Sequence, residues 1–327
     1  MDSIFTLAAN NILSPMVLAF GLGFAASLAR SDLSVPEAAA KALSLYLLFA
    51  IGFKGGVSVA ESGLSGQLIA ALLVGIILSA IIPFIAYALL RSLTKLSVID
   101  AAAVAAHYGS ISVVTFVAAS SALDAVGLSY EGYMVAVAAA MEAPAILSAL
   151  WLIGTRAPGA VRAQGGLMRE ILLNGSIVLL VGSFAIGWIT GPEGLKEIEA
   201  FVIAPFKGVL CLFLLDMGLV AGRGFREARG VLQPGLVGFG LVMPLLGAVL
   251  GGLAGLAIGL SPGGIALLVT LSASASYIAV PAAMRVALPQ ANPSIYLTLS
   301  LGVTFPFNLT LGIPAYIALG VWLGGGA

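Results

Sequence analysis

The segment Leu271–Pro281, Leu-Ser-Ala-Ser-Ala-Ser-Tyr-Ile-Ala-Val-Pro, lies inside an apolar run long enough to cross a bilayer. Its centre nevertheless carries small hydroxyl residues. The segment Tyr108–Thr115 shows the same pattern earlier in the chain, with Gly-Ser-Ile-Ser near its centre. Backbone that leaves the helix at membrane depth is tolerated only where protein or a water-filled cavity satisfies its polar groups. Two such interruptions, one in each half of a chain, predict a single binding site made from two broken helices.

The composition is that of a membrane protein. Of the 327 residues, 61% are hydrophobic and only 9% are charged, and the mean hydropathy is +1.14. A soluble domain carries about 25% charged residues, so this chain could not cover a soluble surface. The formal net charge of zero argues against nucleic acid as a partner. The single cysteine, Cys211, excludes an intramolecular disulfide framework.

Ten apolar runs are long enough for transmembrane helices, each bounded by charge or by Pro and Gly clusters. They are Ile12–Ala29, Ala42–Val59, Gln67–Leu90, Ala101–Leu123, Tyr130–Ile153, Ile171–Ile189, Phe201–Ala221, Leu236–Leu260, Gly263–Leu288 and Ser294–Leu323. The first interruption lies in the fourth run and the second in the ninth. We therefore expect an all-α integral membrane protein of ten transmembrane helices, with the interrupted helices broken at the midplane.

The basic residues are distributed unevenly around these runs. With the N-terminus outside, eleven of the fourteen Lys and Arg residues fall on the inward side. Only Lys54, Lys196 and Lys207 fall on the outward side. Because cytoplasmic loops carry an excess of Lys and Arg, this pattern predicts that both termini lie outside.

The chain also repeats itself. A pair of glycines four positions apart recurs 166 positions later, and the same offset joins the two interruptions. The matched residues are Gly52 with Gly218, Gly56 with Gly222 and Ser110 with Ser276. Five runs in each half would place the halves in opposite orientations. We predict a five-helix repeat over 1–154, a cytoplasmic linker over 155–170 and an inverted repeat over 171–327. Ordinary helix packing is the alternative explanation for the glycines.

The two interruptions supply the predicted substrate site. A broken helix presents backbone N–H groups at one new end and carbonyls at the other, which favour an anion and a cation respectively. Neither stretch contains Lys or Arg, so a small, singly charged oxyanion fits better than a phosphate. Close crossing of two helices through Ser and Ala is the alternative. The predicted substrate-binding residues are Gly109, Ser110, Ile111, Ser112, Ser272, Ser274, Ala275, Ser276 and Tyr277.

Ionisable residues inside the spans are costly and therefore mark candidate sites. Asp216 lies in the seventh run, and Glu142 lies in the fifth beside Pro144. Asp216 either coordinates a coupling cation or pairs with Lys54, which comes from the matched segment of the other half. Glu142 either satisfies backbone freed by the proline or holds a cation. The predicted sodium ligands are Ser112, Thr115, Ser274, Ser276, Asp216 and Glu142.

His107, the only histidine, directly precedes the first interruption and either relays protons or packs as a buried ring. Arg285 follows the second interruption, where snorkelling to the membrane interface explains it. The sequence contains no Walker loop, no His-Glu-x-x-His, no Gly-x-Ser-x-Gly and no Cys/His metal cluster. We therefore do not expect an enzyme.

Along most of its length the chain resembles the sodium-dependent bicarbonate transporters of the SbtA type, best known from cyanobacteria. The segments that carry the resemblance are Val35–Ala38, Ile51–Gly56, Gly109–Ser112, Met141–Pro144, Met217–Gly218, Leu271–Pro281 with Arg285, and Leu288–Ser294. The last of these is the most specific. The resemblance implies ten helices in two inverted repeats, import of bicarbonate coupled to the sodium ion, alternating access and a homotrimer. It also implies a substrate site between the interrupted helices and the inner membrane of a bacterium as the location.

Two features differ from the cyanobacterial members. Tyr277 stands where they carry an acidic residue, and the loop over 154–170 is much shorter than theirs. The short loop weighs against the PII-like cytoplasmic regulator that docks on those proteins. The alternatives are a transporter of the same fold for another small anion, one coupled to protons through His107, and a membrane receptor that binds an anion without moving it.

Overall fold

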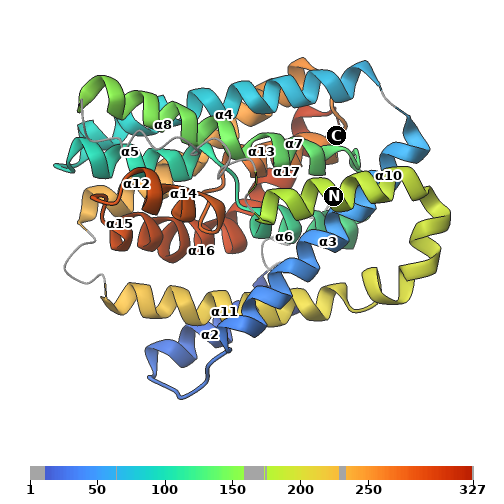
Figure 1. Ribbon diagram of the computed structural model, residues 1–327, viewed down its shortest axis with the longest axis horizontal. Helices are drawn as coiled ribbons and strands as arrows, with labels where there is room; N and C mark the ends of the chain where they lie inside the picture. Colours follow the sequence, from blue (N-terminus) through green and yellow to red (C-terminus); the bar gives the residue numbers. More distant parts are fainter. Residues whose placement is uncertain (1–11, 64, 158–172, 174, 228–232, 326–327) are drawn as a thin grey trace.

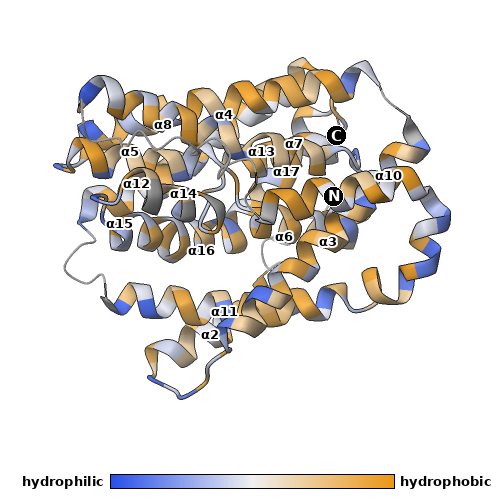
Figure 2. Cartoon of the chain, in the orientation of Figure 1, coloured by the Kyte–Doolittle hydropathy of each residue, from blue (hydrophilic) through white to orange (hydrophobic). Residues whose placement is uncertain are grey.

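The computed structural model describes residues 12–63, 65–157, 173, 175–227 and 233–325. These residues form helices and connecting segments, with no strand among them (Figure 1). Eight of the described helical segments are long and apolar enough to cross a membrane, and two shorter apolar helices accompany them. Hydrophobic residues run along the helices, while hydrophilic residues gather at the two ends of the molecule (Figure 2). The chain is an all-α, multi-pass membrane protein.

The helices before residues 158–172, which lie outside the described part of the chain, match the first five predicted runs. They are α2 (Pro15–Leu28), α3 (Glu37–Ser62), α4 (Gly66–Leu93), α5 (Val98–Gly109), α6 (Val113–Ala125), α7 (Met134–Ala140) and α8 (Glu142–Arg156). Most of the predicted linker, residues 158–170, lies outside the described residues. The run predicted as one helix over Tyr130–Ile153 consists of two helical segments, α7 and α8, that meet at Met141, which the sequence analysis did not predict.

Ten further described elements follow from residue 175 onward. They are α10 (Gly175–Val202), α11 (Phe206–Glu227), α12 (Pro234–Ala257), α13 (Pro262–Ser272), α14 (Ala279–Ala287), α15 (Pro293–Leu297), the π-helix η2 (Thr298–Thr304), α16 (Phe305–Phe307), the π-helix η3 (Asn308–Gly312) and α17 (Ile313–Leu323). The π-helices were not predicted. They surround Pro306 and precede Pro314, and a wider turn accommodates the hydrogen bonds that proline cannot make.

Local sequence explains where several helices begin. A serine precedes the helix and accepts a hydrogen bond from the backbone N–H three residues later, which satisfies one of the free donors of the first turn. The caps are Ser14 of α2, Ser65 of α4, Ser97 of α5, Ser112 of α6 and Ser261 of α13. α10 is divided at Gly191, where φ is 60°. Residues 192–200, which lie between the sixth and seventh predicted runs, form helix as well, with charged residues along Pro192–Glu199.

The repeated glycines bring helices of the two halves into direct contact. A Cβ added at Gly56 of α3 would overlap the carbonyl of Phe184 in α10, and one at Gly218 of α11 would overlap the carbonyl of Phe20 in α2. Only glycine permits such close approach of two backbones. The second helix of each half therefore packs on the first helix of the other half: α3 packs on α10, and α11 packs on α2.

The helices divide into two groups by their contacts. One group contains α2, α3, α10 and α11, which occupy the lower and right parts of Figure 1. The other contains α4 to α8 and α12 to α17, and the α5–α6 segment inside it is almost entirely buried. α4, α8 and α11 each have an arginine in the last turn, and all three helices end on the left side of Figure 1, α4 and α8 at the top and α11 at the bottom.

Candidate functional site

Both helices expected to be interrupted are interrupted. α5 ends at Gly109 and α6 begins at Val113, so Ser110, Ile111 and Ser112 form a non-helical connection. α13 ends at Ser272 and α14 begins at Ala279. These two connections are called the first break (110–112) and the second break (273–278). Their residues are buried, except that Ile278 is partly exposed.

Hydrogen bonds join the second break to the first break and to the last turn of α5. The backbone N–H of Ser112 donates to Ser274 Oγ at 2.9 Å. In the other direction, the N–H of Ser276 donates to the carbonyl of His107 at 2.7 Å. We expected both N–H groups to face an anion. In this structure they hold the breaks together instead, and this reciprocal pair fixes the position of each break relative to the other.

Asn308 in η3 supports the second break from outside. Its Nδ2 donates to the carbonyl of Ala273 at 2.9 Å, and its Oδ1 accepts from the hydroxyl of Tyr316 at 2.7 Å. Within the break, Ser274 Oγ donates to the carbonyl of Leu271 at 2.9 Å. The sequence analysis missed Asn308, although a single amide within an apolar run was a signal that could have found it.

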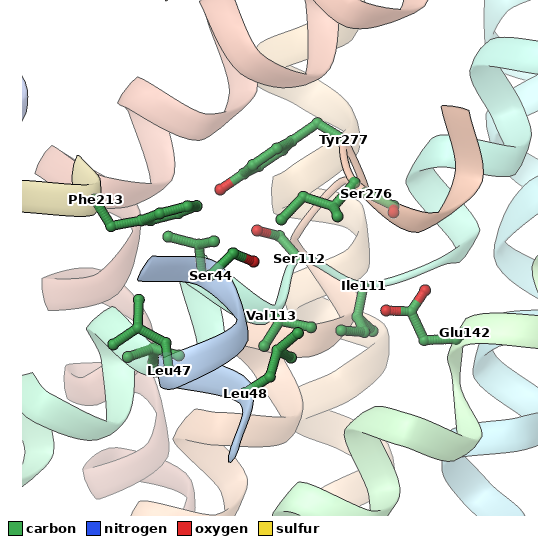
Figure 3. Close-up of a pocket in the computed structure, with 13 residues that line it drawn as sticks. Ser44, Leu47, Leu48, Ile111, Ser112, Val113, Glu142, Phe213, Ser276 and Tyr277 are labelled. Carbon is green, nitrogen blue, oxygen red and sulfur yellow. The ribbon is translucent and has the colours of Figure 1, made fainter. Parts of the chain in front are cut away.

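A small cavity lies beside the breaks, at the boundary between the two helix groups (Figure 3). Its volume of about 20 Å³ suits a small ion or a water molecule. Its walls come from α3 and α11 on one side and from the breaks, α6 and α8 on the other. The lining residues are Ser44, Leu47, Leu48, Ile111, Ser112, Val113, Val114, Val117, Glu142, Phe213, Ser276, Tyr277 and Ile278.

Hydroxyl groups converge on one part of this cavity. The side chains of Tyr277, Ser112 and Ser44 point into the same space in Figure 3. The Tyr277 hydroxyl is buried and makes no hydrogen bond of standard geometry among the described residues, although the Ser112 side chain interacts with it. Ser112 Oγ accepts from the N–H of Thr115 at 3.2 Å, which leaves its own hydrogen available. A buried hydroxyl without a well-formed hydrogen bond is costly, so the Tyr277 donor has a physical reason to bind a ligand.

Among the described residues that line the cavity, Glu142 supplies the only charged side chain. It lies on the opposite side from the hydroxyls in Figure 3. Ser110 Oγ donates to its Oε2 at 2.8 Å, so a residue of the first break positions this carboxylate. The described residues contain no cluster of three or more His, Cys, Asp or Glu that could hold a metal ion. The Glu142 carboxylate and the neighbouring hydroxyls offer oxygen atoms, the ligand type that hard cations prefer.

Other predicted site residues are buried but do not line the cavity. Gly109 packs against Pro83 and Ala145, and a Cβ there would overlap the proline ring. Ser272 lies against Gly251 of α12, and its hydroxyl has no partner among the described residues. Thr115 Oγ1 is likewise buried without one in the described part of the chain. Ala275 and Asp216 are also buried outside the cavity wall, and Ser274 contributes through its bonds to Ser112 and Leu271.

Of the two alternatives for Asp216, the ion pair with Lys54 is not formed in this structure. Among the described residues no ion pair joins them, and Lys54 Nζ instead lies 5.6 Å from the centre of the Phe206 ring. His107 is stacked on Tyr296 with ring centres 4.3 Å apart, and its Nδ1 is bonded to the carbonyl of Ala103 at 2.6 Å. His107 touches the site through its backbone carbonyl, and its ring is not part of the cavity wall.

A family model of the Na⁺-dependent bicarbonate transporter superfamily matches residues 15–320 of the chain. The chain belongs to this superfamily. A search of curated proteins finds no match. The segment that matches the transporter model contains both breaks and every residue that lines the cavity. Membership of this superfamily agrees with the resemblance found in the sequence.

The transporter's cavity also includes residues that the sequence analysis missed. Ser44, Leu47 and Leu48 come from α3, and Phe213 comes from α11. Ser44 is a single hydroxyl in an apolar helix, which is a weak signal. The three apolar residues look like any others in a transmembrane helix, so only the packing of the two helix groups shows that they face the breaks.

Proposed function

We propose that this protein is a secondary active transporter that couples sodium entry to import of bicarbonate or a similarly small monovalent anion. One observation carries the proposal. The cavity offers hydroxyl donors and one carboxylate, and none of its lining residues is Lys, Arg or His. An anion in a buried site without a protein cation is strongly disfavoured. A co-bound sodium ion removes that penalty, which gives a physical reason for coupling.

The anion would lie between the hydroxyls of Ser112 and Tyr277, at the first turn of α6. Both residues line the cavity, and Val113 and Val114 of that turn line it as well. The N-terminal end of a helix carries a partial positive charge, which favours an anion at this position. Ser276 would contribute from the second break. Ser274 and Ser110 would act by positioning, because they are bonded to Ser112 and Glu142 respectively.

Sodium would lie between the anion and Glu142. Of the six ligands expected from the sequence, Ser112, Ser276 and Glu142 are in the cavity wall. Ser274, Thr115 and Asp216 are not, so we assign sodium to the first three. Each offers oxygen atoms, the ligand type that hard cations prefer. The remaining ligands would come from the anion itself.

The simplest architecture that contains this site has ten transmembrane segments in two inverted repeats. The eight long helices account for eight of them, and α2 and the α13–α14 segment would be the other two. Three pairs of matching contacts between the halves support the repeat. The first is the glycine contacts of α3 with α10 and of α11 with α2, and the second is the pair of hydrogen bonds at the breaks. The third lies at the starts of α5 and α13. In the last pair, Asp100 accepts from the N–H of Asn292, and Glu131 accepts from the N–H of Ser261.

Alternating access would come from movement of α2, α3, α10 and α11 against the other helices. The cavity lies at this boundary, with Ser44 and Phe213 on one side and the breaks on the other. Displacing one group relative to the other would therefore open the site without rebuilding either break. The homotrimer, the outward termini and the bacterial inner membrane stay predictions from the resemblance and from the basic residues.

Uptake of labelled bicarbonate into proteoliposomes with an inward sodium gradient tests the site. Ser112→Ala should lower uptake at least tenfold, and Glu142→Gln should raise the sodium concentration needed for half-maximal uptake. Ser120→Ala is the matched control, because Ser120 lies on α6 outside the cavity and donates to Val117. Equal loss in Ser120→Ala and Ser112→Ala would show a general effect on folding and would contradict the assignment.

A further inference from the structure

We infer that this protein binds the phosphate group of an anionic phospholipid between the C-terminal ends of α4 and α8. A second cavity of about 440 Å³ opens there, and none of its described lining residues belongs to the breaks. Its lining residues are Phe84, Tyr87, Ala88, Arg91, Val98, Leu152 and Arg156. Two are arginines, and none is acidic. The inference does not depend on what the protein transports.

Both arginines are held by neighbouring groups. The guanidinium carbon of Arg156 lies 6.0 Å from the centre of the Tyr87 ring, and this cation–π contact joins two residues of the cavity wall. Arg91 Nη1 donates to the carbonyl of Leu96, in the segment that connects α4 to α5. Asp100 is the acidic residue closest along the chain, and it is engaged by Ser97 Oγ and the N–H of Asn292. The described residues include no ion pair to Arg91 or Arg156, so their charge is available to an outside anion.

The surroundings of the cavity are those of a lipid-facing surface. Trp151 and Phe84 form an edge-to-face pair at its rim, with ring centres 5.6 Å apart. Both rings are exposed, as are Ile77 and Ile81 farther along α4. Tryptophan is enriched where a membrane helix reaches the headgroups, and arginines just beyond it lie at the level of lipid phosphates.

This arrangement selects a lipid over other partners. A phosphate could accept hydrogen bonds from both guanidinium groups, while the acyl chains cover the exposed aromatic rings and isoleucines. A soluble anion would use only the first of these contacts. The arginines also lie on the side that the basic residues predict to be cytoplasmic, where anionic lipids are attracted to basic pockets between helices.

Native mass spectrometry of the purified, detergent-solubilised protein tests the inference. We would titrate phosphatidylglycerol and phosphatidylcholine with identical acyl chains and compare wild type with the double variant Arg91→Gln/Arg156→Gln. Each basic contact at a membrane surface changes affinity by about fivefold, so the double variant should bind phosphatidylglycerol roughly thirtyfold more weakly. Phosphatidylcholine binding should not change. Arg226→Gln, which removes an arginine at the same end of the molecule but outside the cavity, should behave as wild type.

Three outcomes would overturn the inference. One is unchanged preference for phosphatidylglycerol in the double variant. Another is an equal effect of soluble glycerol phosphate on thermal stability, which would indicate a free anion. The third is a change of oligomeric state in the double variant with lipid binding intact, which would make the surface a contact between copies. Arg91→Lys/Arg156→Lys retains both charges, so binding within about threefold of wild type in this variant supports an electrostatic site.

Discussion

Replacing Tyr277 by Phe should make the protein more stable and a poorer transporter. The Tyr277 hydroxyl is buried without a hydrogen bond of standard geometry among the described residues, and it points into the cavity. Burying such a group costs about 1–3 kcal/mol, so removing its oxygen should raise the free energy of unfolding by about 1 kcal/mol. For a chain of this size the melting temperature of the substrate-free protein should rise by about 2 °C.

Transport by the same variant should become weaker, although its stability increases. A hydrogen bond from a neutral donor to a charged acceptor contributes about 1.5–3 kcal/mol, which corresponds to roughly 10- to 150-fold in affinity. We therefore expect the KM for bicarbonate to rise by about that factor in Tyr277→Phe. Differential scanning fluorimetry without substrate and initial rates of bicarbonate uptake into proteoliposomes measure the two effects separately.

Tyr316→Phe is the matched control for this pair of measurements. The same oxygen is removed, but the Tyr316 hydroxyl donates to Asn308 Oδ1 at 2.7 Å and does not line the cavity. This variant should lose about 1 kcal/mol of stability and keep its KM. A Tyr277→Phe protein that is less stable than wild type, or that has an unchanged KM, would refute the reasoning about the Tyr277 hydroxyl.

Three further predictions follow from other contacts. Gly218→Ala should lower the free energy of unfolding by about 3 kcal/mol, because the new Cβ meets the backbone of Phe20. Gly21→Ala on α2 is the control, because its Cβ meets nothing within 4 Å and the change should be neutral. Thermal denaturation of both variants measures the difference. Glu131→Gln should lower the free energy of unfolding by about 1 kcal/mol. It removes the charge of the carboxylate that accepts hydrogen bonds from the N–H and Oγ of Ser261 at 2.7 and 3.0 Å. Equal melting temperatures of this variant and the wild type would contradict the prediction. His107→Gln should retain the wild-type pH profile of uptake at a fixed sodium gradient, because the ring does not face the cavity, and a flattened profile would show proton coupling instead.

The two breaks were predictable because they leave a direct mark on the sequence. Transmembrane helices are built mostly from large apolar residues, so Ser-Ala-Ser-Ala-Ser at 272–276 signals backbone that another part of the protein must satisfy. The positions of the breaks, 110–112 and 273–278, agree with this expectation. The glycine pairs could be recognised in the sequence too, but the sequence did not show that α2 and α10 are the helices that pack against them.

The details of the site depend on packing that the sequence does not record. Ser44 and Phe213 face the cavity only because α3 and α11 cross beside the breaks. The N–H groups of Ser112 and Ser276 were expected to be free, but each finds an acceptor in the other half of the molecule. The Asp216–Lys54 pair was inferred from matched positions, yet similar positions along two helices do not ensure that two side chains meet.

Concentrative uptake by the wild-type protein tests the central claim most directly. Proteoliposomes would be loaded with labelled bicarbonate at the same concentration inside and outside, at fixed pH, and then given an inward gradient of sodium or of potassium. The account predicts net accumulation of bicarbonate with sodium and none with potassium. Equal behaviour under the two gradients would contradict sodium coupling, and sodium-dependent binding without accumulation would identify a receptor in place of a transporter.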